Sequence, residues 1–124
     1  YALEGVTQLM RTIEAVRHAM NKELRLGSIL MTMFDGRTRL STQVDEEVRT
    51  HFARETMSTR IPRSVRVSEA PSYSRSVLTY EPTSAGAVAY REAAAEFAKR
   101  HACDEHSTNT SGVKHPDASD TKKG

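Results

Sequence analysis

A short apolar run at positions 26–34, Leu-Gly-Ser-Ile-Leu-Met-Thr-Met-Phe, constrains the fold of this chain most strongly. A run that is short and nearly continuously apolar is typical of a parallel strand covered on both faces. The turn dipeptide Asp35-Gly36 follows it and ends the strand. We therefore expect Thr32, Met33 and Asp35 at the carboxyl end of a buried strand.

A second, β-prone run, Thr56 to Ile61, lies downstream of the first. Pro62 follows it, and the strand must stop there because proline lacks the backbone donor and has a fixed φ. Ser68 is positioned to cap a short helical turn, which Pro71 limits. We expect a strand end, an irregular loop and one helical turn. In open α/β sheets, ligands bind at the carboxyl ends of the strands.

Apolar residues recur at helical spacing in three segments, Leu3 to about Asn21, Ser41 to about Ala53 and Ser84 to about Arg100. Val77 to Tyr80 is interpreted as a short extended piece. The order helix, strand, helix, strand, loop, helix predicts half of a doubly wound α/β sheet. Two short strands do not make a self-sufficient sheet, so apolar surface should be exposed unless further strands cover it.

The charged residues of the predicted helices are interpreted as structural. Ser41 is expected to be an N-cap, and the acids Asp45 to Glu47 would complement the dipole at that helix start. They are therefore interpreted as capping charges rather than catalytic acids. Glu96 and Arg100 are assigned to the outer face of the last helix.

The chain has 124 residues, within the range of one domain, and a formal net charge of +2. Its single cysteine, Cys103, excludes an internal disulfide and a four-cysteine metal site and agrees with a cytosolic protein. The histidines are isolated, and no Ser/His/Asp or Cys/His arrangement is visible, so we predict neither catalytic residues nor a metal site.

No apolar run approaches the length of a membrane span, and there is no signal peptide. Residues 101–124 are polar and lack periodicity, which predicts a disordered tail.

Three arginines, at positions 60, 63 and 66, lie on or beside the loop after the second strand, against a single acid, Glu69. On residue chemistry alone, an ordinary solvated basic loop is the preferred interpretation. The full string at positions 61–72, Ile-Pro-Arg-Ser-Val-Arg-Val-Ser-Glu-Ala-Pro-Ser, changes that weighting. It closely resembles the signature of the ParA/Soj chromosome- and plasmid-partitioning ATPases, deviant-Walker P-loop proteins related to MinD. Two further stretches, Tyr1-Ala-Leu-Glu-Gly5 and Leu30-Met-Thr-Met-Phe-Asp-Gly-Arg-Thr38, match in the right order.

The resemblance covers residues 1–100 and implies that they are the C-terminal part of a ParA-type ATPase domain, followed by the tail at 101–124. The Gly-Lys-rich phosphate loop, both Walker aspartate motifs and the Mg²⁺ ligands would then lie upstream of Tyr1. Phosphoryl transfer to water needs these groups, so this chain alone should not hydrolyse ATP.

The resemblance also implies a nucleotide site. In ParA-like and MinD-like folds, the strand end with Thr32 and Met33 and the loop with Pro62 and Arg63 flank the adenine of ATP. Two alternatives stay open for single residues. The Thr32 hydroxyl could instead bond a neighbouring backbone group, and Arg63 could be a surface charge.

Arg37 and Arg66 match two arginines that the family uses to bind DNA. A flexible guanidinium on an exposed loop is well suited to phosphate. The family pattern after Ser72 is usually His-Gly-Lys-Pro, whereas this chain has Tyr-Ser-Arg-Ser at 73–76, which leaves the path of this loop open. Ala85 stands where the family has a basic residue, so whether this position contributes a phosphate contact also stays open.

The function implied by the resemblance is that of an ATPase in chromosome or plasmid segregation. ATP would hold a homodimer that binds DNA without sequence preference, and a ParB-type partner would stimulate hydrolysis. The location implied is the cytoplasm, on the nucleoid and not on a membrane. Two alternatives remain. One is a MinD-like regulator of division-site or cargo positioning, although the tail lacks the basic amphipathic helix expected of a membrane anchor. The other is a non-enzymatic DNA-binding module.

Overall fold

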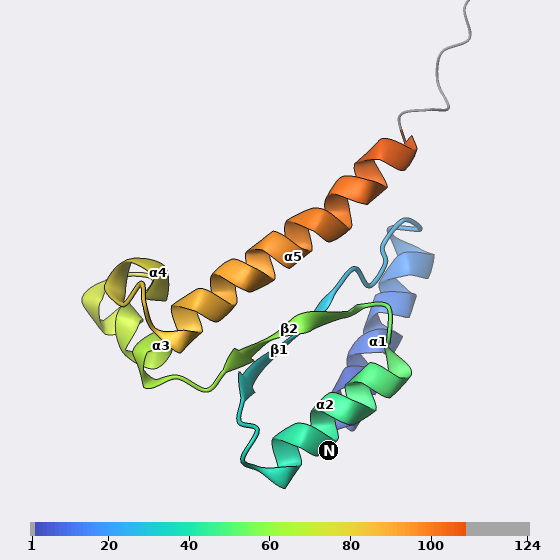
Figure 1. The fold of residues 1–124 in the computed structure, drawn as a ribbon. Helices are drawn as coiled ribbons and strands as arrows, with labels where there is room; N and C mark the ends of the chain where they lie inside the picture. The colour runs from blue at the N-terminus through green and yellow to red at the C-terminus, as the bar shows by residue number, and fades with distance from the viewer. Residues whose placement is uncertain (1, 109–124) are drawn as a thin grey trace, which may run out of the picture.

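The computed structural model describes residues 2–108 and shows a mixed α/β fold with a parallel two-stranded sheet (Figure 1). The elements in chain order are α1 (Ala2–Ala19), β1 (Ile29–Phe34), α2 (Arg39–His51), β2 (Thr56–Pro62), α3 (Val65–Glu69), the 3₁₀ turn η1 (Ala70–Tyr73), α4 (Val77–Tyr80) and α5 (Ala85–Thr108). The predicted fold class, part of a doubly wound α/β domain, is confirmed.

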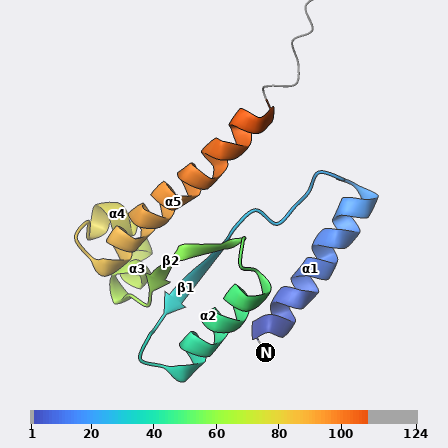
Figure 2. The same ribbon diagram turned by 45° about the vertical axis from the view of Figure 1, so that its right-hand side comes forward.

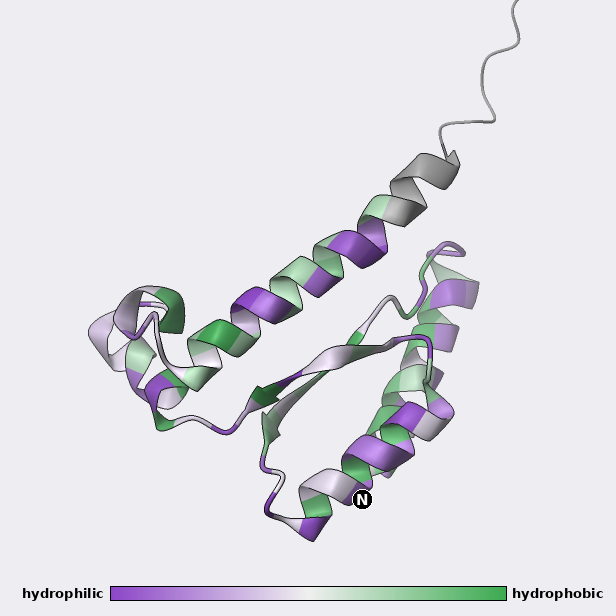
Figure 3. Cartoon of the chain, in the orientation of Figure 1, coloured by the Kyte–Doolittle hydropathy of each residue, from purple (hydrophilic) through white to green (hydrophobic). Residues whose placement is uncertain are grey.

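Helices cover the two strands from both sides. In Figures 1 and 2, α5 runs along one side of β1 and β2, and α1 and α2 lie on the other. The apolar and polar residues of α1 and α2 alternate in bands, as expected of amphipathic helices (Figure 3). No helix among residues 2–108 is long and apolar enough to cross a membrane.

The pairing of β1 with β2 is irregular in two places. Ile29 pairs with Thr56, Met31 with Arg60, and Phe34 with Pro62. Extra residues therefore lie first in β2, around Ser58 and Thr59, and then in β1, around Met33. At each irregularity the extra residues are left out of the regular strand pairing, so their backbone N–H and C=O groups can bond elsewhere.

The core lies where α5 packs on β2 and on the short helices. Ile61 is 2% exposed and packs with Met57, and Ala89 and Ala93 of α5 contribute small side chains to the same cluster. A second cluster joins α5 to the α3–α4 segment through Ala70, Val77 and Ala87. A Cβ on Gly86 would lie 2.6 Å from Val67 Cγ2. Glycine therefore permits the close approach of α5 to α3.

Glu96 and Arg100 correct the sequence-based prediction, because both bind β2 instead of facing outward. The Glu96 carboxylate accepts hydrogen bonds from the Ser58 N–H at 2.6 Å and the Thr59 N–H at 2.9 Å, and another from the Thr59 hydroxyl. Arg100 donates to the carbonyls of Arg54 and Thr56, each at 2.9 Å. Burial works to raise the pKa of Glu96, but these hydrogen bonds lower it to about 2.

Asp45 is also misassigned by the sequence pattern. The N-cap of α2 is Thr38, whose hydroxyl accepts from the Ser41 N–H at 3.3 Å, so neither Ser41 nor Asp45 caps the helix. Asp45 is 4% exposed, and its Oδ2 accepts from Arg49 of the same helix and from Arg60 of β2. Burial works to raise the pKa of Asp45, yet the two guanidinium groups hold it below its usual value.

Three local predictions also differ from the structure. The backbone is extended at Ser64, and α3 begins at Val65, so Ser68 lies inside that helix instead of capping it. Val77–Tyr80 is helical, not extended, because Val77 is buried in the second cluster and the Thr79 N–H donates to the Ser76 carbonyl. The last helix continues through Thr108, beyond the expected end near Arg100. The remainder of the predicted tail, residues 109–124, lies outside the described residues.

Candidate nucleotide site and neighbouring arginines

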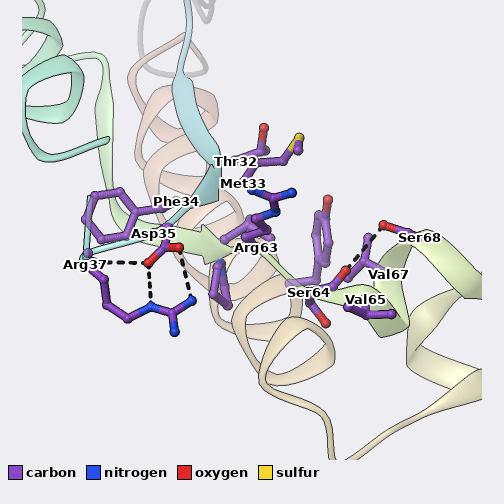
Figure 4. Close-up of a pocket in the computed structure, with 14 residues that line it drawn as sticks. Thr32, Met33, Phe34, Asp35, Arg37, Arg63, Ser64, Val65, Val67 and Ser68 are labelled. Atoms are coloured by element: carbon purple, nitrogen blue, oxygen red, sulfur yellow. Dashed lines mark hydrogen bonds and ion pairs between the residues drawn. The ribbon is translucent and has the colours of Figure 1, made fainter. Parts of the chain in front are cut away.

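An open hollow of about 850 Å³ lies at the carboxyl ends of β1 and β2 (Figure 4). The segment after β1 forms one wall, and the segment from β2 into α3 forms another. The residues that line it are Thr32, Met33, Phe34, Asp35, Gly36, Arg37, Ile61, Pro62, Arg63, Ser64, Val65, Val67, Ser68 and Tyr90. Ligands of open α/β sheets bind at this edge, because the strands there deliver several loops to one place.

The hollow brings together all four residues predicted from the sequence to contact nucleotide: Thr32, Met33, Pro62 and Arg63. Arg37 lies on its rim as well, whereas Arg66 is not among the lining residues. The two strand ends are joined by a hydrogen bond from the Arg63 N–H to the Phe34 carbonyl at 3.0 Å. That these residues bind nucleotide stays a prediction.

Met33 has an unusual backbone. Its φ of 52° lies in the left-handed region, and the residue is 68% exposed beside the hollow. A non-glycine residue in this region costs about 1–2 kcal/mol. Met33 lies within the second irregularity of the strand pairing, so the strain accompanies the extra residue in β1. Strained residues of this kind concentrate at functional sites.

Two of the four predicted residues have free polar groups. Within residues 2–102, neither the exposed Thr32 hydroxyl nor the exposed Arg63 guanidinium makes a hydrogen bond or ion pair with another side chain or with the backbone. The alternative of a backbone-bonded Thr32 hydroxyl is therefore not seen. Both groups are available to a ligand in the hollow.

Asp35 and Arg37 form a two-point ion pair across the turn that follows β1. Arg37 Nε lies 3.0 Å from Oδ1, and Nη2 lies 3.2 Å from Oδ2 (Figure 4). The Arg37 N–H also donates to Oδ1 at 3.1 Å, which holds the turn. These hydrogen bonds from Arg37 lower the pKa of Asp35, and the positive charge of Arg63 adds to the effect.

Arg66 also has an acidic partner. Its Nη1 lies 3.1 Å from Glu69 Oε2, and the Tyr80 hydroxyl donates to the same oxygen at 3.3 Å. Burial and the charge of Glu69 raise the pKa of Tyr80, whose ring stacks on Tyr73 at 4.9 Å.

The structure shows the path of the loop after Tyr73, which the sequence left open. Ser74, where the family usually has glycine, takes a left-handed φ of 53°. Its N–H donates to the carbonyls of Ala70 and Pro71. A left-handed backbone of the kind that glycine favours is therefore present without glycine.

Some features of this site were missed from the sequence. The sequence places Asp35 at the strand end but does not predict its ion pair with Arg37. An aspartate two residues before an arginine, with the glycine of a turn between them, could have indicated that pair. Tyr90 of α5 also reaches the hollow, and it was not predicted from the sequence as a site residue. No group of three or more potential metal ligands occurs among the residues that the structure describes.

Comparison with known proteins identifies the relatives of this chain. It is 50% identical over 100 residues to the chromosome-partitioning ATPase Soj of Thermus thermophilus, covering 81% of this chain and 40% of that protein. The chromosome partitioning protein ParA of Caulobacter vibrioides is 49% identical over 100 residues, with 81% and 38% covered. The sporulation initiation inhibitor protein Soj of Bacillus subtilis is 45% identical over 98 residues, with 79% and 39% covered. No protein-family model matches the chain.

The chain therefore spans about two fifths of the length of the curated relatives it matches. The resemblance predicted from the three motifs is confirmed by these identities, which extend over most of the chain. The chain is homologous to the C-terminal part of the ParA/Soj chromosome-partitioning ATPases.

Proposed function

We propose that this chain supplies the nucleobase-binding wall of a ParA-type, ATP-hydrolysing protein. The observation that supports it best is the hollow, where Thr32 and Met33 from one motif meet Pro62 and Arg63 from another. The two motifs are far apart in sequence and meet at the carboxyl ends of adjacent parallel strands. In this proposal the phosphate loop and the Mg²⁺ ligands lie in the part of the complete protein that this chain does not match.

The chemistry of the hollow suits a purine base. The apolar ring of Pro62 and the polarisable thioether of Met33 provide apolar contact to a planar ligand. The free Thr32 hydroxyl can donate to a ring nitrogen or accept from the exocyclic amino group of adenine, and the Arg63 guanidinium can pair with an anionic part of the ligand. A bound Mg²⁺ would supply charge neutralisation on the phosphates, and no residue of 2–108 is assigned to hold it.

We further propose that the ATP-bound dimer binds DNA without sequence preference through Arg37 and Arg66. Their side chains are 91% and 54% exposed, so phosphate oxygens can reach them without disturbing the core. Arginine contacts to phosphate carry no base information. In this proposal a ParB-type partner stimulates hydrolysis and releases the protein from the nucleoid, and the protein acts in the cytoplasm, away from membranes.

The nucleotide proposal is tested by titration calorimetry with ATP on the complete protein containing these residues. The double variant Pro62→Ala/Arg63→Ala should lose about tenfold or more in affinity. Arg11→Ala removes an equivalent charge from the exposed side of α1 and should change nothing. Unchanged affinity in the double variant would remove both residues from the site.

The DNA proposal is tested by measuring affinity for duplexes of several sequences at several salt concentrations. Arg37→Ala or Arg66→Ala should weaken binding to all sequences alike and reduce the slope of log affinity against log salt by about 0.9 per lost contact. Sedimentation with ATP checks that the dimer persists. If both variants dimerise and keep the wild-type affinity and slope, the DNA surface lies elsewhere.

A further inference from the structure

The Asp35–Arg37 pair occupies the groups that a DNA phosphate would need. Arg37 presents two N–H groups, on Nε and Nη2, to the two oxygens of Asp35. A phosphate bound to Nε and Nη2 in the same two-point manner requires the same in-plane edge of the guanidinium. Carboxylate and phosphate therefore compete for Arg37, and one must leave before the other binds in that geometry.

The two partners differ in how firmly they are held. The Asp35 side chain is only 19% exposed and is fixed by the Arg37 N–H, whereas the Arg37 side chain is 91% exposed. The Asp35 carbonyl also accepts from the N–H and hydroxyl of Thr38, which anchors the start of α2. The carboxylate is thus part of the turn, and the guanidinium is the group that can swing away.

We propose that Asp35 is an autoinhibitory residue that restrains Arg37 from DNA phosphates. This inference rests on the DNA-binding role proposed above. When the Arg37 guanidinium swings away, the Asp35 carboxylate keeps its hydrogen bond from the Arg37 N–H and its attraction to Arg63. The negative charge of Asp35 is therefore still partly compensated. The restraint is therefore reversible and modest.

The other proposed DNA contact is restrained less. Arg66 meets Glu69 through a single hydrogen bond from Nη1, and Glu69 shares that oxygen with Tyr80. A one-point contact gives up less geometry than a two-point contact when phosphate arrives. The main restraint on DNA binding is accordingly placed at Asp35.

The test is a fluorescence-anisotropy titration of a duplex with the ATP-bound complete protein. Asp35→Asn keeps an oxygen acceptor for the Arg37 N–H while removing the charge. Because an exposed ion pair contributes little, the variant should bind DNA only about 1.4- to fivefold more tightly. Asp35→Ser, which also keeps an acceptor, repeats the measurement if the asparagine variant folds poorly.

Two controls separate release of Arg37 from a general gain of positive charge. Glu46→Gln removes a negative charge from the middle of α2, in a surface hollow that Arg37 also lines. Glu46 makes no ion pair within residues 2–102, so this variant should produce a smaller gain. In the Arg37→Ala background, Asp35→Asn should give no more than the Glu46→Gln effect. An equal gain in either control, or no gain from Asp35→Asn alone, overturns the inference.

The outcomes also separate this inference from the proposed function. If the wild-type protein with ATP does not bind DNA, the proposed DNA role fails. If it binds, and Arg37→Ala weakens binding while Asp35→Asn has no effect, only the restraint by Asp35 is wrong. If Arg37→Ala changes nothing, the contact assigned to Arg37 is wrong and the restraint falls with it.

Discussion

Two sets of arginine–carboxylate pairs in this molecule use the same chemistry at different depths. Inside, Asp45 binds Arg49 and Arg60, and Glu96 binds Arg100, and these arginine side chains are 28–37% exposed. At the carboxyl edge of the sheet, Arg37 and Arg66 pair with acids but are 91% and 54% exposed. The exposure of the arginine, rather than the presence of a partner, separates the pairs that hold the fold from those that are available to a ligand.

The largest effect is expected at Asp45. Asp45→Ala leaves Arg60 half-buried and without its carboxylate, so the free energy of unfolding should fall by about 2–4 kcal/mol. Urea unfolding of the complete protein measures it, with Glu47→Ala, an exposed acid on the same helix, as the control. A loss as small as that of the control would place Asp45 with the surface pairs.

Glu96 should make stability depend on acid pH. Its pKa is about 2 in the fold, below the ordinary 4.5, so its contribution is fully present above pH 4.5 and is lost as the pH falls toward 2. The loss should be on the order of 3 kcal/mol at most. Unfolding measured from pH 6 to pH 2 should show a shallower dependence in Glu96→Gln than in the wild type. Parallel curves would mean that the carboxylate does not depend on the Ser58 and Thr59 amides.

Ser74 should yield a small gain. Ser74→Gly relieves the left-handed φ of 53° and should raise the free energy of unfolding by up to about 1 kcal/mol, since glycine tolerates this conformation but also gains entropy when unfolded. Thermal unfolding checks the sign. Ser76→Gly, next to this corner and at an ordinary extended φ of −77°, should be neutral or destabilising. Loss of stability in Ser74→Gly would contradict the strain.

The smallest effect on stability is expected from the exposed pairs. Arg37→Ala and Arg66→Ala should each leave the free energy of unfolding close to that of the wild type, even though each removes an ion pair. Denaturant unfolding at low salt, where surface pairs count most, is the strictest measurement. A loss of 2 kcal/mol or more, roughly the size expected for a buried pair, would show that exposure of the arginine does not distinguish the two sets of pairs.

The residue pattern predicts the framework and where its strands end, whereas the assignment of a nucleotide site to those ends came from the family resemblance. Periodicity locates strands, and Pro62 and Asp35-Gly36 mark where they end, so the residues at those ends must meet if the strands are parallel neighbours. Thr32, Met33, Pro62 and Arg63 do meet, although nothing in the local sequence states how large the space between them is.

The inward-facing charges could not be predicted in the same way. A periodic pattern assigns polar residues to the outside of a helix, and Asp45 and Glu96 break that rule because their partners lie far along the chain on β2. The irregular strand pairing that exposes the Ser58 and Thr59 amides leaves no mark in the residue types. Val77 to Tyr80 is a similar case, because burial of Val77 against α5 decides its conformation.

The Glu96 contact has a consequence for how the sheet can be extended. Unpaired amides along a strand are a template on which another strand, from the same or a different molecule, can add. By accepting from two amides of β2, Glu96 keeps those amides from pairing with an added strand. The residue that steadies the fold also discourages polymerisation through β2.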